Sequence, residues 1–185
     1  MDAFASHVGQ EVADLFSAGL KAYWKRALPP NPSDYPNGQV PWKALAALAG
    51  VSLTVSDGVE IFSLHTEDVA KAAQIAVWAL PGPPVWFEPL FIARPDLVAA
   101  ALNPWVLDEI KEEQPGTGIR GAFVLAMHCP SYIRRALIAG ATSLVLDGTV
   151  KNGTVLQQLV PALYEDGLMS QVEFDAVCRR QLEHG

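Results

Sequence analysis

Charged residues are scarce in this chain. They make up 18% of its 185 residues, against 50% for hydrophobic residues. A chain of this length and balance must bury much of its surface in a core, which argues against disorder over its whole length. The charge that is present is acidic, with a formal net charge of -7. Because phosphate binding depends on clustered Lys and Arg, this balance argues against nucleic acid as a main partner.

Cysteines and long apolar runs are also few. Cys129 and Cys178 lie far apart and do not form a disulfide framework. The first residues show neither a basic n-region nor an apolar h-region, so no secretory signal is visible. No apolar run approaches the ~20 residues that span a bilayer. We therefore expect a cytoplasmic protein without a membrane part.

Catalytic and metal-binding patterns are missing as well. The four histidines have no metal-ligand spacing, and Gly116-Thr117-Gly118 lacks the Lys-Ser or Lys-Thr of a phosphate loop. Adjacent side chains rarely face each other, so His128-Cys129 is interpreted as a helix end with a buried cysteine rather than a nucleophile beside its base. The sequence therefore predicts no catalytic residue, no metal site and no cofactor.

Helical periodicity is what the sequence does contain. Apolar residues recur at steps of three and four between prolines and glycines, which predicts eight or nine helices joined by short loops. Their ranges are 2–27, 42–49, 66–80, 84–93, 95–110 with a kink or split at Asn103-Pro104, 119–127, 132–146, 155–166 with a kink at Pro161, and 171–181. Short loops favour antiparallel helix pairs, in a HEAT-like or irregular array. We expect one mainly α domain over residues 1–185, with candidate sub-units 1–50 and 63–185.

One stretch departs from this pattern. Val51, Leu53 and Val55 alternate with small polar residues, and Asp57-Gly58 follows. Alternation on either side of Asp-Gly indicates a β-hairpin, here over residues 51–61. A single hairpin is marginally stable in water, so it would have to lean on neighbouring helices.

The tryptophans provide the first candidates for a partner surface. Trp24 and Trp78 lie on or beside apolar stripes and are predicted to pack between helices. Trp86 and Phe87 are adjacent and bulky, and they point in different directions. One of the two is therefore a candidate exposed contact for a protein partner.

An acidic run provides the second candidate surface. Asp108, Glu109, Glu112 and Glu113 cluster at a predicted helix C-terminus, where the helix dipole disfavours negative charge. Acid–base catalysis would need a cleft and separated pKa values. The run is better interpreted as a solvated face, or as a surface that meets basic residues of a neighbouring module.

Several segments taken together resemble a known family. They are Gly19-Leu20-Lys21-Ala22-Tyr23-Trp24-Lys25-Arg26, Leu48-Ala49-Gly50-Val51, Trp78-Ala79-Leu80, Pro84-Val85-Trp86-Phe87-Glu88-Pro89-Leu90 and Ala93-Arg94-Pro95-Asp96-Leu97-Val98. This series resembles the helical region that follows the NTPase in large bacterial NACHT/STAND-type proteins. The resemblance implies a HEAT-like scaffold that senses or binds a partner within a larger chain. No Walker A lysine motif occurs here, so ATP binding is not implied.

Three functions follow as hypotheses. The first is a protein-interaction or sensor module of helical-repeat type, part of a larger bacterial defence or signalling protein, whose partner is another protein or a neighbouring domain. The second is a small helical enzyme or ligand-binding bundle, with Tyr35, Tyr132, Arg134 or His128 as polar groups of a cavity. The third is an immunity-type inhibitor that acts by binding alone, which the acidic charge suits.

Overall fold

The computed structural model describes residues 2–35, 39–56, 61–79, 82–112 and 121–184, and these are mainly helical. The helices are α1 Asp2–Val8, α2 Gln10–Arg26, α3 Trp42–Ser56, α4 Thr66–Ala76, α5 Phe87–Ala93, α6 Pro95–Lys111, α7 Ala122–Met127, α8 Ser131–Ile138, α9 Ala141–Leu146, α10 Gly153–Glu165 and α11 Gln171–His184, with short 3-10 helices η1 Pro32–Asp34 and η2 Ile61–Ser63. No strand occurs among these residues, which confirms the mainly α prediction. The division into sub-units stays a prediction.

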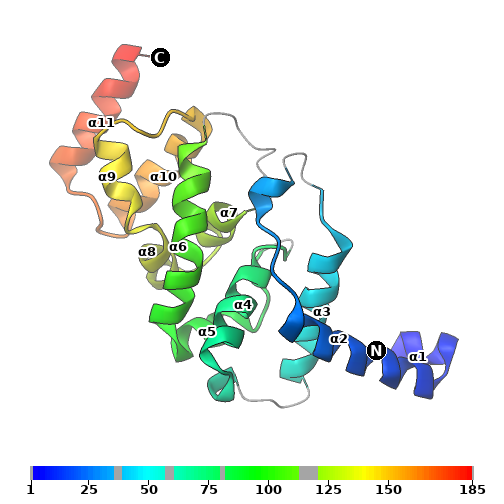
Figure 1. The fold of residues 1–185 in the computed structure, drawn as a ribbon. Coiled ribbons are helices and arrows are strands. Elements are labelled where there is room, and N and C mark those ends of the chain that lie inside the picture. The colour runs from blue at the N-terminus through cyan, green and yellow to red at the C-terminus, as the bar shows by residue number, and fades with distance from the viewer. Residues whose placement is uncertain (1, 36–38, 57–60, 80–81, 113–120, 185) are drawn as a thin grey trace.

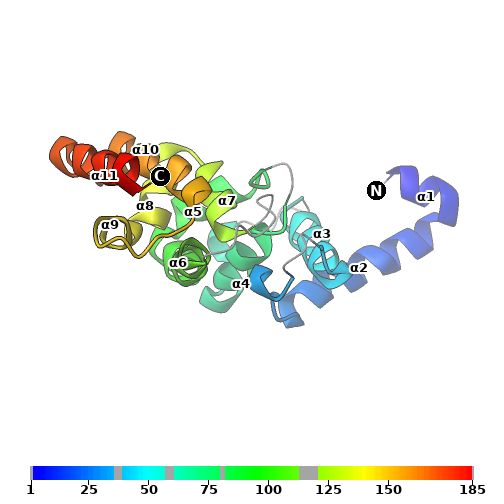
Figure 2. The same ribbon diagram turned by 90° about the horizontal axis from the view of Figure 1, so that it is seen from above.

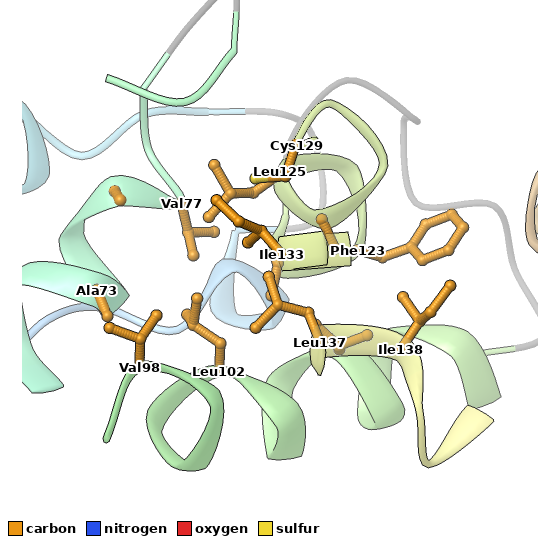
Figure 3. Close-up of a cluster of buried hydrophobic side chains, with 14 of the residues drawn as sticks. Ala73, Val77, Val98, Leu102, Phe123, Leu125, Cys129, Ile133, Leu137 and Ile138 are labelled. Carbon is orange, nitrogen blue, oxygen red and sulfur yellow. The ribbon is translucent and has the colours of Figure 1, made fainter. Parts of the chain in front are cut away.

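Helix α6 runs through the middle of the molecule, as Figure 1 shows. It contacts α4, α5, α7, α8 and α9. Its buried residues Val98, Leu102, Val106 and Ile110 recur every four positions, so they form one stripe along the helix. Figure 3 shows side chains from α4 and α8 gathered near Val98 and Leu102 of this stripe, among them Ala73, Ile133 and Leu137.

The predicted β-hairpin is wrong in its first strand, because residues 51–56 continue α3. Alternation with Ser and Thr suggested a strand, but these hydroxyls bond back to the preceding helical turn. Ser52 Oγ donates to the Leu48 carbonyl oxygen over 2.9 Å, and Thr54 Oγ1 donates to that of Gly50 over 2.7 Å. Residues 57–60 lie outside the described part of the chain.

The helix predicted over 42–49 continues past Gly50, which lies inside α3 where α2 crosses that helix (Figure 1). A Cβ at Gly50 would overlap the main-chain carbonyl oxygen of Leu20 and approach Trp24 Cδ1 to 3.0 Å. Trp24 is fully buried, and its Nε1 donates to Thr54 Oγ1 over 2.9 Å. The absent side chain therefore lets the two helices approach closely enough for Trp24 to reach Thr54.

Glycines divide two helices that the periodicity predicted as continuous. Gly9, with a φ of 87°, separates α1 from α2. A non-glycine residue would be strained in that left-handed region. Gly140 lies between α8 and α9, so the helix predicted over 132–146 is two helices.

Pro104 does not split α6, contrary to one of the two expectations for Asn103-Pro104. The Asn103 amide, oriented so that its nitrogen faces two carbonyl oxygens, donates to Ala99 over 3.1 Å and to Leu137 over 3.2 Å. It thus links the turn before the proline to the last turn of α8. Pro161 likewise lies inside the continuous helix α10.

Side chains cap the N-termini of the last two helices, α11 and α10. Ser170 and Glu173 form a capping box at α11, because the Ser170 N–H donates to Glu173 Oε2 over 2.8 Å and the Glu173 N–H donates to Ser170 Oγ over 3.3 Å. At α10 the cap is Asn152, which precedes the start of the predicted range 155–166. Its Oδ1 accepts hydrogen bonds from the N–H groups of Thr154 and Val155.

Within the described ranges, no individual helix has both the length and the apolarity needed to cross a bilayer. Helices α5 and α6 together have enough apolar length, but they meet at a bend of 117°.

Candidate interaction surface

Trp86 and Phe87 do not form an exposed contact, so the prediction that one of them remains available to a partner is wrong. Trp86 is 4% exposed and Phe87 is fully buried. Trp86 Nε1 donates to Ser52 Oγ over 3.1 Å, which joins the start of α5 to α3. Both side chains belong to the same hydrophobic core.

The acidic run is divided between the surface and an internal contact. Asp108 and Glu112 are exposed, and Asp108 pairs with Lys111 at 3.7 Å on the same helix. Glu109 instead faces α7, and Glu113 lies outside the described residues. The described residues therefore do not form an acidic partner surface from all four carboxylates.

Glu109 caps the N-terminus of α7. Its two carboxylate oxygens accept hydrogen bonds from the N–H groups of Ala122 at 2.8 Å and Phe123 at 2.9 Å. Gly121 precedes them with a φ of 146°, and a Cβ there would overlap the Glu109 carboxylate. Burial raises the pKa of Glu109 to about 7, against the opposing effect of the two N–H groups, and the charge of Glu112 raises it further.

This carboxylate predicts a pH dependence of stability. Folding raises the pKa of Glu109 from 4.5 to about 7, so the folded state binds more protons between these values. The contribution of Glu109 to stability is thus greatest below pH 4.5 and falls as the pH rises to 7. Relative to a Glu109→Gln variant, the wild type should lose roughly 1–3 kcal/mol of unfolding free energy across this range.

Urea unfolding at a series of pH values, followed by circular dichroism, measures this difference. Glu112→Gln is the matched control, because Glu112 is an exposed carboxylate near the end of the same helix. It should keep most of the pH dependence of the wild type, because it removes only the smallest of the effects that shift the pKa of Glu109. If the unfolding free energy changes equally with pH in the wild type and in Glu109→Gln, folding does not shift the pKa of Glu109.

The polar groups proposed for a ligand cavity each have a partner of their own. Tyr35 packs edge-on against Trp78, with ring centroids 5.6 Å apart. Tyr132 donates its hydroxyl hydrogen to the Glu88 carboxylate, which raises the pKa of Tyr132 to about 12. The other two groups, Arg134 and His128, contact Asp166 and the Val124 carbonyl oxygen respectively.

Cys129 is buried, as the sequence predicted. Burial, together with the charge of Glu88, raises the pKa of its thiol to about 12, so the thiol stays protonated and is a poor nucleophile. Among the residues that the structure describes, no three His, Cys, Asp or Glu side chains come together in a way that could hold a metal ion.

Helix α2 carries an exposed apolar surface that the sequence analysis did not identify. Val8 at the end of α1 and Val12 and Leu15 of α2 are 39%, 51% and 69% exposed. On the opposite side of α2, Ala13 and Trp24 are buried. Figure 2 shows that α1 and the first turns of α2 extend away from the remaining helices. We call the exposed α2 residues Val12, Leu15, Gly19 and Ala22 the outer α2 face.

Aromatic side chains extend this surface along one side. Phe16 is 52% exposed, and Trp42 at the start of α3 is 74% exposed. The Trp42 ring stacks on Tyr23 of α2, with centroids 6.1 Å apart and an interplanar angle of 23°. Large apolar side chains are thus exposed both on α2 and at the start of α3.

The sequence did contain a signal for this face. Val12 and Leu15 lie on the same helix as the apolar residues Leu20 and Trp24, but the steps between them place the two pairs on different sides of that helix. A single buried stripe does not account for apolar residues on both sides. The excess indicates a second contact.

Comparison with models of protein families, with curated proteins and with solved structures gives no match. The resemblance to the helical region of NACHT/STAND-type proteins therefore rests on the sequence segments quoted above.

Proposed function

We propose that this chain is a helical protein-interaction scaffold and that the outer α2 face is its contact surface. The observation that carries this proposal is the exposure of Val12 and Leu15 on a helix whose opposite side is already packed on α3. Exposed apolar surface costs free energy in water, about 25 cal/mol for each Å². A partner that covers this face removes that cost.

The wider setting is also a proposal. We place the chain in the cytoplasm, as a sensing or binding module of a larger bacterial defence or signalling protein. Two free cysteines, one of them partly exposed, suit a reducing compartment. The resemblance to the helical region of NACHT/STAND-type proteins supports the larger assembly.

Capture of proteins from a cell lysate tests the contact surface. The baits are the tagged wild type, a Val12→Glu/Leu15→Glu variant and a Val172→Glu control, and quantitative mass spectrometry identifies what each retains. Val172 is 76% exposed on α11, so its replacement adds a charge without altering the outer α2 face. We expect the wild type and the control to retain the same proteins, and the double variant to lose at least one of them.

Circular dichroism of each bait shows whether it is folded. If the folded double variant captures the same proteins as the wild type, the outer α2 face is not the contact surface and the proposed function fails.

A further inference from the structure

We propose that the outer α2 face binds the same face of a second copy of this chain, with the two α2 helices antiparallel. This inference shares one premise with the proposed function, namely that the outer α2 face is a contact surface. Its own evidence is the spacing, the size and the charge of the exposed residues.

The spacing is that of a coiled-coil seam. Within α2, Val12, Leu15, Gly19 and Ala22 follow one another at steps of three, four and three residues. This is the heptad repeat by which two helices keep one side in mutual contact. Gly19 and Ala22 are exposed like the larger residues before them, so the seam is open along its length.

The sizes of these residues favour the antiparallel orientation. Large side chains occupy the first half of the seam and small ones the second half. When the helices run in opposite directions, Val12 lies opposite Ala22 of the second copy and Leu15 lies opposite its Gly19. A Cβ at Gly19 would meet nothing within 4 Å, so there is room for the leucine. A parallel pair would set glycine against glycine and leave a gap.

The charges favour the same orientation. Glu11 and Lys25 lie on one side of the seam, two heptads apart, and both are exposed. In the antiparallel pair, Glu11 of each copy lies beside Lys25 of the other. Neither residue has an ion pair with another residue in the described part of the chain. In a parallel pair Glu11 would face an aromatic residue instead. Edge charges of this kind determine orientation more than affinity.

The other side of the seam is aromatic. Phe16 lies there near the two-fold axis of the proposed pair, and Tyr23 with its stacked partner Trp42 lies further along. Stable interfaces bury about 1,200–2,000 Å² in total, and contact between two single helices buries less than this. The exposed Trp42 ring widens the contact beyond α2.

Sedimentation equilibrium of the purified chain measures the proposed association. We expect a dimer for the wild type and for the control Val172→Glu, and a monomer for Leu15→Glu. Glu11→Lys and Lys25→Glu should each weaken the dimer by at least about five-fold, since each replaces two edge ion pairs, worth about 0.5 kcal/mol apiece, with like-charge contacts. The Glu11→Lys/Lys25→Glu double variant restores both pairs with reversed signs and should regain the affinity of the wild type.

A symmetric cross-link tests the orientation independently. Ala18 lies midway between Glu11 and Lys25 on the same side, so in the antiparallel pair it lies beside Ala18 of the second copy. Ala18→Cys in a Cys178→Ser background should form a disulfide-linked dimer on mild oxidation. Asp14→Cys in the same background is the control, because Asp14 is exposed on α2 but lies off the seam.

A monomeric wild type at concentrations up to about 1 mM would overturn the inference. A dimer that Leu15→Glu leaves intact would place the contact elsewhere and overturn it too. The antiparallel pair would be excluded if the Glu11→Lys/Lys25→Glu variant did not regain the dimer affinity of the wild type and Ala18→Cys formed no cross-link. If the wild type is monomeric but lysate capture still depends on Val12 and Leu15, the proposed function stands and only the second copy is excluded as its partner.

Discussion

Replacement of Trp24 by alanine should lower the free energy of unfolding by about 3–5 kcal/mol. Trp24 is fully buried where α2 crosses α3, so the variant would leave a large cavity. The Thr54 hydroxyl would also lose the hydrogen bond from Trp24 Nε1. Partial collapse around the site is restricted, because the backbones of the two helices already approach closely at Gly50.

Trp42→Ala is the matched control. The same residue type is removed from the neighbouring helix, but Trp42 is 74% exposed and only its stacking on Tyr23 is lost. Its replacement should cost less than about 1 kcal/mol. Urea unfolding followed by circular dichroism, at a low protein concentration that keeps association out of the measurement, gives both values. Equal losses for the two variants would mean that Trp24 does not anchor α2 to α3.

Replacement of Arg134 by methionine should cost about 3 kcal/mol. Arg134 of α8 donates two hydrogen bonds to Asp166 at the end of α10, Nε to Oδ2 over 2.7 Å and Nη2 to Oδ1 over 2.8 Å. The Asp166 side chain is only 1% exposed. Methionine keeps most of the arginine stem but leaves this buried carboxylate without a cation, and removal of one partner from a buried pair is costly.

Glu165 provides the control for this pair. It lies 3.7 Å from the same guanidinium, but its side chain is 67% exposed. Solvent screens such a contact, so Glu165→Gln should change stability by less than about 1 kcal/mol. The Arg134→Met/Asp166→Leu variant removes both charges and should recover part of the loss. A loss for Arg134→Met no larger than that for Glu165→Gln would contradict the structural role of the pair.

Much of the local structure could be predicted because it depends on neighbours in the sequence. The Ser170 capping box lies within one turn of α11, and its geometry is set by residues three positions apart. The burial of Trp24 and Trp78 followed from the apolar stripes on which they lie. The β prediction for residues 51–56 was wrong because alternation takes no account of hydroxyl groups that bond back to a helix.

The candidate site could not be predicted in the same way. Trp86 and Phe87 are buried because α3 and the core lie on both sides of them, and Glu109 faces α7, whose N–H groups come 13 and 14 residues later. These contacts join segments whose relative position is decided by packing. Periodicity along one helix does not contain that information.

The sequence by itself determined that this chain is mainly helical and where several of its helices begin and end. These properties follow from backbone hydrogen bonding, prolines, glycines and caps, all of which act over a few residues. Only the tertiary structure decided which side of α2 is covered by α3 and which side remains exposed. The reason is steric: at Gly50 the two helices can approach closely, so α3 covers the Trp24 side and leaves Val12 and Leu15 in water.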